Sequence, residues 1–297
     1  MNRSVLFALA LSMSVCGFAQ VVNVGEVTKV DLPQAAKVAA ISPQGDYLLL
    51  TSDANQGLTK FDLATGESSV LTKAAGAGYN VKISDDGQNV VYREKSTNKA
   101  RLQQTAVQSR NFATGEVKNL VKPTRDLNAV AIEGNSVMTV NKRKMQAKSL
   151  DSNKARKGTV LYTENYQLMV SENGKARQLS PLGANRRYIW PALSPDGTKA
   201  LFFVSGDGAY VCNLDGSGMQ RLGTLRAAKW LNDNVIVGMN DTDNGEITTA
   251  SQIVAVNLQG QRQVLTDDSL IAMYPQVGNN KIAFSTRDGE AYIINLK

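Results

Sequence analysis

The segment YIWPALSPDGTKALFFVSGDGAYVCNLDGSGMQRL, residues 188–222, consists of four short apolar runs separated by turn residues. Its first turn, Ser194-Pro195-Asp196-Gly197, has a clear physical basis, because proline holds φ at about −65° and glycine accepts positive φ. The runs on either side of the turns are typical of short strands. The segment therefore predicts a four-stranded antiparallel unit with strands at 188–193, 199–204, 209–214 and 219–222.

The same strand-turn-strand pattern recurs along the chain. Ser42-Pro43-Gln44-Gly45 and Ser84-Asp85-Asp86-Gly87 also separate two apolar runs, and the tetrapeptide Ala-Thr-Gly-Glu occurs at both 64–67 and 113–116. Six apolar residues directly precede a turn of this kind, three of them in weaker versions: Ile41, Ile83, Ile132, Leu193, Leu231 and Val277. This spacing predicts six repeats of about 40–45 residues, some with loop insertions.

The last repeat lacks its fourth strand, because the sequence stops after the run 292–296. Residues 25–30 have the pattern of the fourth-strand segment 115–120, so we expect the N-terminal strand to complete the last unit. A ring buries the apolar faces of every unit, whereas an open array leaves two end faces exposed. The sequence therefore predicts an all-β fold with one domain over 20–297: a six-bladed β-propeller of four-stranded antiparallel blades, closed by the N-terminal strand.

The repeat also resembles a known family. The Ser-Pro-Asp-Gly turn, the apolar strand after it and the later glycine turn that leads to Arg221-Leu222 resemble the WD40-like (PD40) repeat of TolB propellers. The resemblance extends over nearly all of the mature chain and implies a protein-binding propeller of the cell envelope. TolB carries a separate α/β domain before its propeller, and this sequence has no room for one, so TolB's full set of partners is not implied.

Residues 1–19 are typical of a secretory signal peptide. Arg3 precedes the apolar run 5–11, and Ala19 ends a small-residue cleavage site. The run is shorter than the roughly 20 residues of a transmembrane helix. Cys16 is near the position of a lipidated cysteine, but the bulky Val15 disfavours lipidation. We expect cleavage after Ala19 and a periplasmic or secreted monomer.

The residue types restrict the possible chemistry. The chain has no histidine, which excludes Ser-His-Asp and Cys-His catalysis, and it has no Gly-x-Ser-x-Gly elbow. The predicted innermost strands are poor in acids and carry Lys82, Asn128, Tyr188 and Lys229. Residues 240–246, with Asp241 and Asp243, offer oxygen ligands for calcium, but a solvated turn explains them equally well. We predict no enzyme, no cofactor and no metal.

The formal net charge of +7 is concentrated in one segment. Residues 142–157 contain seven basic residues against the single acid Asp151, so the rest of the chain is balanced and nucleic-acid binding is not indicated. We predict that 142–157 is an extended connection between the second and third strands of the third blade. It is either a solvated hairpin or a docking surface for an anionic envelope component or acidic protein.

One face of the predicted propeller should combine this segment with aromatic and arginine residues, which are enriched at binding hot spots. The candidate binding residues are Tyr79, Arg186, Arg187, Tyr188, Trp190, Tyr274, Lys142, Arg143 and Lys144. Trp190-Pro191 and Tyr274-Pro275 occupy equivalent repeat positions, so an alternative is that both aromatics wedge between blades.

These observations favour a non-catalytic binding or scaffold propeller that engages a protein or glycan in the cell envelope. The alternative is a calcium-dependent or carboxylate-based hydrolase or lyase with its site at the channel mouth. Three or more acids and amides converging there would favour the enzyme, whereas arginine, lysine and aromatic residues would favour binding. A sensor or assembly subunit also remains open.

Overall fold

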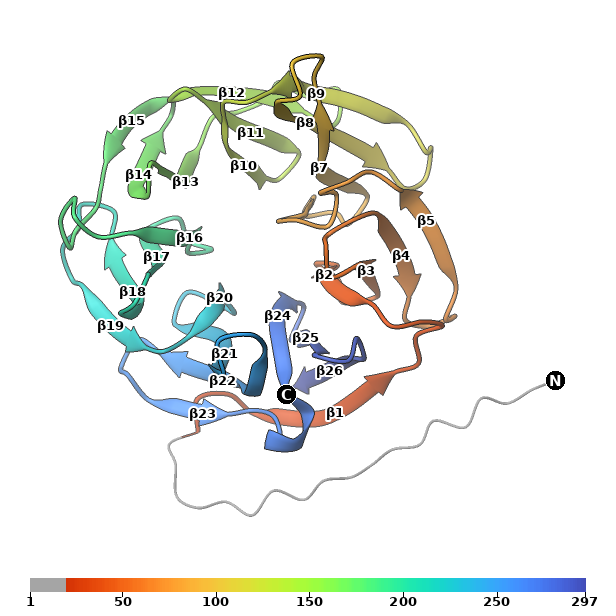
Figure 1. The fold of residues 1–297 in the computed structure, drawn as a ribbon, viewed down its shortest axis with the longest axis vertical. Coiled ribbons are helices and arrows are strands. Elements are labelled where there is room, and N and C mark those ends of the chain that lie inside the picture. Colours follow the sequence, from red (N-terminus) through yellow and green to blue (C-terminus); the bar gives the residue numbers. More distant parts are fainter. Residues whose placement is uncertain (1–19) are drawn as a thin grey trace.

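The computed structural model describes residues 20–297, which form seven antiparallel β-sheets arranged in a ring (Figure 1). The predicted all-β propeller is confirmed, but the predicted number of six blades is wrong. Five sheets have four strands and two have three. The predicted signal peptide and Cys16 lie outside the described residues. Within 20–297 there is no helix long and apolar enough to span a bilayer.

Four blades follow the chain in simple order. Blade 1 contains β2 (Lys37–Ile41), β3 (Tyr47–Thr51), β4 (Leu58–Asp62) and β5 (Ser68–Thr72). Blade 2 contains β6 (Lys82–Ile83), β7 (Asn89–Thr97), β8 (Gln103–Asn111) and β9 (Val117–Thr124). Blade 5 contains β16 (Tyr188–Leu193), β17 (Lys199–Val204), β18 (Gly208–Asn213) and β19 (Gln220–Gly223). Blade 6 contains β20 (Arg226–Trp230), β21 (Val235–Asp243), β22 (Thr248–Asn257) and β23 (Arg262–Val264), and the 3-10 helix η1 (Asp268–Leu270) follows it.

Blade 5 matches the predicted unit to within one residue at every strand end. The amide of Gly197, at φ 73°, donates a hydrogen bond to the Ser194 carbonyl, and the Ser194 hydroxyl lies 2.5 Å from an Asp196 carboxylate oxygen. Ser42 and Ser84 make the same kind of contact to an aspartate, Asp46 and Asp86. The glycine amide donates to the serine carbonyl in all three turns, so the backbone closes the first hairpin of blades 1, 2 and 5 in the same way, although Ser42 bonds an aspartate four residues on rather than two.

The region predicted as one long third repeat forms two three-stranded blades. Blade 3 contains β10 (Leu127–Glu133), β11 (Ser136–Asn141) and β12 (Lys144–Ser149). Blade 4 contains β13 (Thr159–Glu164), β14 (Gln167–Glu172) and β15 (Lys175–Gln178). The basic segment is therefore not one extended connection. Lys142 and Arg143 form a two-residue turn with φ 45° and 64°, and the six residues after them are a strand.

The two short blades lack different strands. The Arg156 amide, just before β13, donates to the Ser136 hydroxyl at the start of β11, and Arg143, at the end of β11, pairs with Glu164 at the end of β13. Strand β13 therefore runs parallel to β11 and opposite to the innermost strands β10 and β16. Judged by direction, blade 3 lacks an outermost strand and blade 4 lacks an innermost one.

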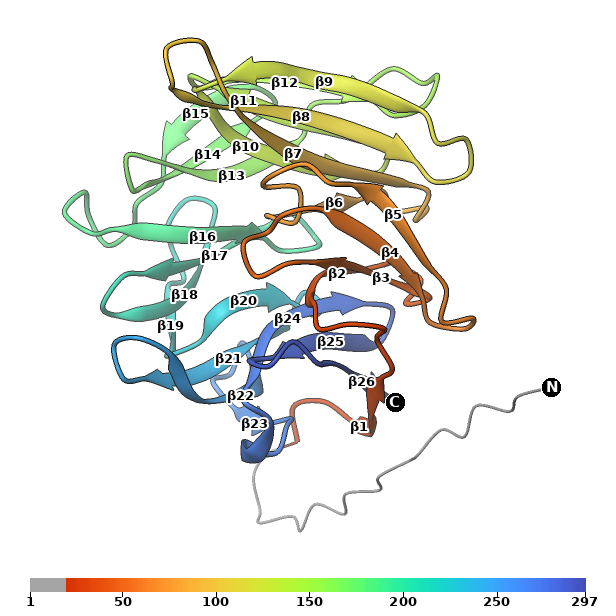
Figure 2. The ribbon, with the colours of Figure 1, turned by 45° about the vertical axis from the view of Figure 1, so that its right-hand side comes forward.

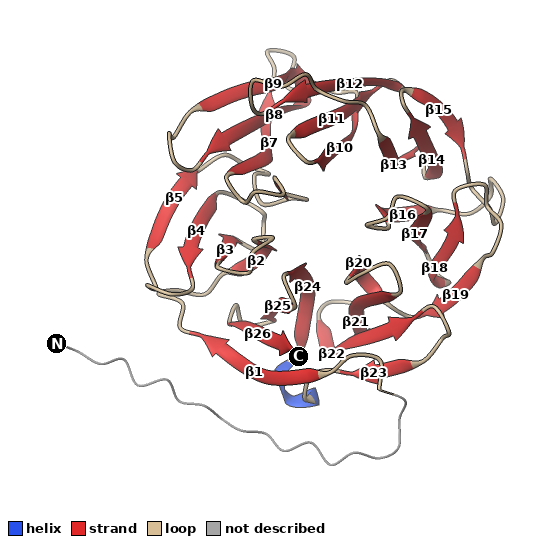
Figure 3. Ribbon diagram, turned by 180° about the vertical axis from the view of Figure 1, so that it is seen from behind, coloured by secondary structure: helices blue, strands red, loops and turns tan. Residues whose placement is uncertain are grey.

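The predicted ring closure is confirmed. Blade 7 contains β24 (Ala272–Gly278), β25 (Lys281–Thr286), β26 (Ala291–Leu296) and, as its outermost strand, β1 (Val24–Val30). Val27 pairs with Ile294 and Thr28 with Ile293. Figure 3 shows β1 alongside β26 at the rim. A Cβ at Gly25 would lie 2.9 Å from the Asn295 carbonyl oxygen, so glycine lets the two backbones approach closely.

Apolar clusters between neighbouring blades hold the ring together. Leu201 and Val211 of blade 5 share a buried cluster with Ile236 and Val254 of blade 6. The cluster at the closure joins Leu48 of blade 1 to residues of blade 7. Each fully buried aliphatic side chain contributes about 1.5–3 kcal/mol. The ring is therefore stabilised by contacts between blades as well as by pairing within each sheet.

Candidate functional site

The second-to-third-strand turns and the segments that enter the innermost strands lie on one face, as predicted, and we call it the mouth face. The Tyr188 amide, at the start of β16, donates to the carbonyl of Tyr166 in the β13–β14 turn. The Arg187 guanidinium carbon lies 4.2 Å from the centroid of the Tyr166 ring. Arg186 lies 4.0 Å from an Asp207 carboxylate oxygen.

Bulges in two innermost strands present aromatic side chains at this mouth. Trp190 in β16 and Tyr274 in β24 lie at register shifts and have φ of 51° and 56°. Positive φ is a genuine outlier for residues of this size and costs about 1–3 kcal/mol. The side chains are 44% and 41% exposed, so neither is wedged between blades. Trp190 contacts Phe203 on one side, at 5.4 Å between ring centroids.

Blade 2 has a related arrangement. Asn80, three residues before the last residue of β6, also has positive φ, and Tyr79 before it is half exposed. The buried Arg93 of β7 donates to the carbonyls of Tyr79 and Asn80 at 3.3 and 3.2 Å. Burial lowers the pKa of Arg93, while Tyr79 opposes that shift. Arg93 therefore holds the backbone that positions Tyr79.

A cavity of about 220 Å³ opens between blades 7 and 1, where the ring closes, and we call it the seam cavity. It is lined by Tyr274 together with Lys37, Asp53 and Arg287. The Lys37 ammonium lies 2.5 Å from Asn55 Oδ1 and 5.4 Å from the centroid of the Tyr274 ring. Burial lowers the pKa of Lys37, and Asp53 acts in the opposite direction.

Two lysines carry positive charge into the central channel. Lys82 lies in β6 and Lys229 in β20, the innermost strands of blades 2 and 6. Burial, followed by repulsion from Lys229 and Arg93, lowers the pKa of Lys82 to about 7. Burial also lowers the pKa of Lys229. Blades 1 and 7 separate these two blades, so the ammonium groups influence each other across the channel, and within 20–297 no carboxylate forms an ion pair with either.

Some predicted residues lie away from the exposed surface or are engaged by neighbours. Tyr188 is fully buried, its ring packs on Phe202, and its hydroxyl accepts from the Leu182 amide, so it cannot contact a partner at the surface. Lys142 pairs with Asp126 at 3.1 Å and Arg143 with Glu164 at 2.5 Å.

The structure brings Tyr79, Trp190 and Tyr274 to the mouth of one channel. The basic turn of blade 3 is on the same face but farther from the channel, because it joins β11 and β12 rather than the innermost strand β10. Lys144 begins β12 there and is exposed. Sequence reasoning missed Lys37, Asp53 and Arg287. The chain ends must meet before these residues line one cavity, and no local pattern reveals that.

The possible calcium ligands of residues 240–246 and the thiol of Cys212 both make contacts within the propeller. Asp241 and Asp243 belong to the end of β21, and Arg226 Nη1 lies 2.7 and 3.7 Å from their carboxylate oxygens. Burial raises the pKa of Asp241, with Arg226 opposing the shift. In the part of the chain that the structure describes, no three His, Cys, Asp or Glu side chains converge as metal ligands would. Cys212 is buried, and burial raises its pKa to about 11, so it is a packing residue.

Comparisons with known proteins agree with this architecture. No family model matches the chain, and no curated protein matches it. The structure of a putative TolB from Agrobacterium tumefaciens is similar, with a TM-score of 0.52, 15% identity, and coverage of 94% of this chain and 99% of that one. The fold is shared with TolB.

Two further structures are similar at the same identity. TolB from Acinetobacter baumannii has a TM-score of 0.50 and 15% identity, with 79% of this chain and 54% of that chain covered. An oligogalacturonate lyase in complex with manganese has a TM-score of 0.47 and 15% identity, with 86% and 76% covered. At this identity the likeness to the two TolB structures shows a β-propeller fold and no more. The resemblance to TolB in the sequence is confirmed at that level.

Proposed function

We propose that this chain is a non-catalytic binding propeller of the cell envelope, which engages a protein or glycan partner through its mouth face. The observation that carries the proposal is the composition of the channel mouth. Trp190 and Tyr274 are held exposed there in a strained conformation, and Lys37, Lys82 and Lys229 provide positive charge. Strain of this kind persists where the surrounding structure maintains it, and it is typical of ligand sites.

The charges indicate which chemical groups such a partner presents. The ammonium groups of Lys82 and Lys229 repel each other across the channel and lack a carboxylate partner within the described residues. An acidic group placed over the channel, such as a carboxylate of a protein side chain or an acidic sugar, relieves that repulsion. Exposed aromatic rings beside it suit the apolar faces of sugars or side chains. Arginine, lysine and aromatic residues at the mouth support binding over hydrolysis.

Affinity capture tests the proposal directly. Residues 20–297 are immobilised and exposed to native envelope extract, and bound proteins and glycans are quantified by mass spectrometry. We expect W190A/Y274A to lose most of the captured material. The matched control M219A/V264A removes two similarly exposed side chains, from other surface positions, and should retain it. Equal captured sets for the two variants would show that the mouth face is not the binding surface.

The channel charge gives a pH-dependent test. The folded pKa of Lys82 is about 7, below its ordinary value, so between about pH 7 and 10.5 the unfolded chain binds a proton that the folded chain does not. Stability therefore rises with pH over that window. We expect K82M to gain about 1 kcal/mol, or about 2–4 °C in Tm, at pH 6 and to lose the gain near pH 10.

The control for this test is K122M, which alters an exposed lysine of β9 and should leave Tm unchanged at both pH values. Citrate serves as a carboxylate probe: at pH 6 it should raise the Tm of the wild type more than that of K82M/K229M, because the variant lacks the two channel cations while its other basic sites are unchanged. A citrate effect of equal size in both proteins contradicts the assignment of the channel cations.

A further inference from the structure

The outermost strand of blade 3 has an open edge. In blade 5 the third strand, β18, pairs with β17 on one side and β19 on the other. The third strand of blade 3, β12, pairs with β11 from Lys144 to Ser149, and over residues 20–297 no strand pairs with its other edge. Edges of this kind expose backbone N–H and C=O groups that can accept an additional strand.

The surroundings of this edge are strongly basic. Seven basic residues lie within 142–157, and the one acid among them, Asp151, accepts hydrogen bonds from Ser149, Asn153 and Asn135. These bonds lower the pKa of Asp151, with Ser149 the largest cause. The side chains of Lys144 and Lys148 are exposed and form no ion pair within the described part of the chain, whereas Met145 between them is buried.

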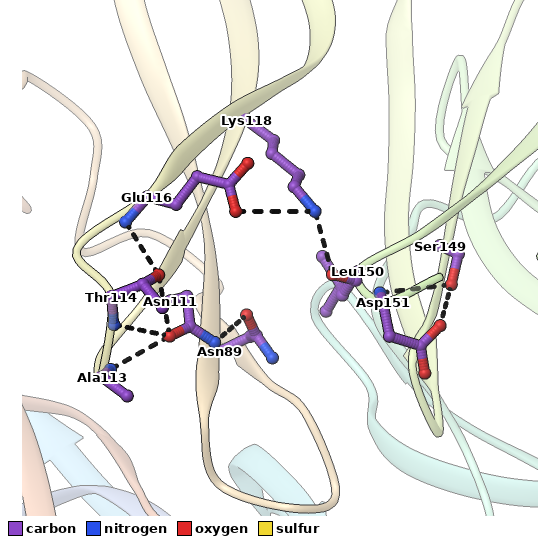
Figure 4. A network of polar contacts seen from close by, with 9 residues as sticks. All are labelled: Asn89, Asn111, Ala113, Thr114, Glu116, Lys118, Ser149, Leu150 and Asp151. Atoms are coloured by element: carbon purple, nitrogen blue, oxygen red, sulfur yellow. Dashed lines mark hydrogen bonds and ion pairs between the residues drawn. The ribbon is translucent and has the colours of Figure 1, made fainter. Parts of the chain in front are cut away.

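Features at both ends of β12 limit the space beside the edge. At one end, the Lys118 ammonium of β9 lies 3.2 Å from the Leu150 carbonyl oxygen and 3.8 Å from a Glu116 oxygen (Figure 4). At the other end is a cavity of about 510 Å³, lined by residues that include Arg125, Asp126 and Lys142. The turned view shows β9 and β12 along the same rim of the ring (Figure 2), where Lys148 Nζ lies 3.4 Å from the Asn119 carbonyl oxygen of β9. Blade 2 therefore contacts both ends of β12, and exposed lysines flank the open edge between them.

The positive charge around the edge selects among possible occupants. A second copy of this chain would place Lys144 and Lys148 against the same lysines, and edge lysines of this kind oppose self-association. An extended segment with carboxylates at alternate positions is attracted, and its backbone can satisfy the open edge. We propose that the outer edge of β12 binds an extended acidic segment of a partner protein, which becomes the fourth strand of blade 3.

Synthetic peptides test this surface without knowledge of the partner. The probe is a fluorescein-labelled hexapeptide with glutamate alternating with valine, acetylated and amidated at its ends, and binding to residues 20–297 is measured by fluorescence anisotropy. We expect binding to weaken about tenfold or more when lysine replaces glutamate, because the charges then repel. A probe N-methylated at alternate residues keeps its charge but loses strand hydrogen bonds, and it should bind equally weakly.

Variants of the protein locate the site. K144E/K148E should weaken binding of the acidic probe about tenfold. The control K73E/K297E makes the same change in net charge at two exposed lysines far from β12, in blades 1 and 7, and should leave binding unchanged. W190A/Y274A should also leave it unchanged, so that failure at the mouth face and failure at this edge are separate results. Hydrogen-deuterium exchange should show that the probe slows exchange within 144–149.

Three results would overturn the proposal. One is equal affinity for the N-methylated and unmethylated probes, which would mean attraction by charge alone. Another is unchanged affinity in K144E/K148E. The third is a probe that slows exchange in other strands but not in β12.

Discussion

Blade 5 has four strands and a Ser-Pro-Asp-Gly turn, whereas blade 3 has three strands and turns through Gly134-Asn135. In blade 5 the two middle strands are the most buried, with four of the six residues of β17 and five of the six of β18 buried. In blade 3 the most buried strand is β11, with four of its six residues buried. The outermost strand of blade 5, β19, contributes a single buried residue, Leu222. The comparison shows that contact between blades depends on the middle strands, so a blade can lose an outer strand and still occupy its place in the ring.

Blade 4 also has three strands, but it lacks the strand nearest the channel, whereas blade 3 lacks the outermost one. Its first strand, β13, has the direction and burial of a second strand, with Val160, Leu161 and Tyr162 buried. It nevertheless stands nearest the channel in its sheet (Figure 1). A missing innermost strand is tolerated because β13 still packs on both neighbouring blades: Val160 and Tyr162 share a buried cluster with blade 3, and Leu161 shares one with blade 5.

The largest expected effect compares the same truncation in the two kinds of blade. Leu201 and Leu161 are the third residues of β17 and β13, and their side chains are 1% and 9% exposed. We expect L201A to lower the free energy of unfolding by about 4 kcal/mol and L161A by about 2–3 kcal/mol, because the second site is less enclosed. Urea unfolding measures both. A larger loss for L161A would mean that the three-stranded blade packs as tightly as blade 5.

A second prediction concerns local opening of the sheets. Amides of β18 are flanked by strands on both sides, whereas β12 has one neighbour. We expect the outward amides of β12 to exchange much faster than those of β18, because unpaired groups need no opening event. Hydrogen-deuterium exchange with peptide-level resolution measures the difference. Equal protection of the two strands would contradict an open edge.

The smallest effect concerns the turns. The carboxylate of Asp196 accepts bonds from the Ser194 hydroxyl and from the Thr198 amide and hydroxyl, whereas the Gly134-Asn135 turn has no carboxylate between its paired ends. These bonds, Ser194 first, lower the pKa of Asp196 to about 2. We expect D196A to cost less than about 1 kcal/mol at pH 7, since the group is exposed.

The pH dependence of D196A follows from the direction of that shift. A lowered folded pKa adds stability that is complete above about pH 4 and is lost as the pH falls through about 2. The unfolding free energies of wild type and D196A should therefore converge below about pH 2. Thermal unfolding between pH 2 and 5 measures this, and a constant difference over that range would assign the effect of D196A to something other than the carboxylate.

Several elements follow directly from local sequence. The strands of blade 5 were predicted to within one residue, because proline and glycine at fixed turn positions leave the backbone few alternatives. The pairing of Val27 with the strand of Ile294 was predicted from the missing fourth strand of the last repeat. The blade number was not, because blades 3 and 4 lack the Ser-Pro-Asp-Gly turn and together fill one long interval between Ile132 and Leu193.

The candidate site was predicted in part. Trp190 and Tyr274 were identified from composition and equivalent repeat positions, and the structure places both exposed at the mouth. Tyr188 was identified by the same reasoning, but alternation along the strand turns it into the core. Lys37 and Arg287 are separated by 250 residues, and no periodicity links them.

Local backbone preferences and the alternation of apolar residues were therefore enough to specify the strands and turns of blade 5 and the closing strand, because these depend on neighbours in the chain or on the repeat pattern. The number of blades was decided only by the tertiary structure. It determines in turn where the seam cavity forms, which lysines face one another across the channel and that β12 has an open edge. That number is decided by packing between blades, because each blade must cover the apolar faces of two neighbours at once.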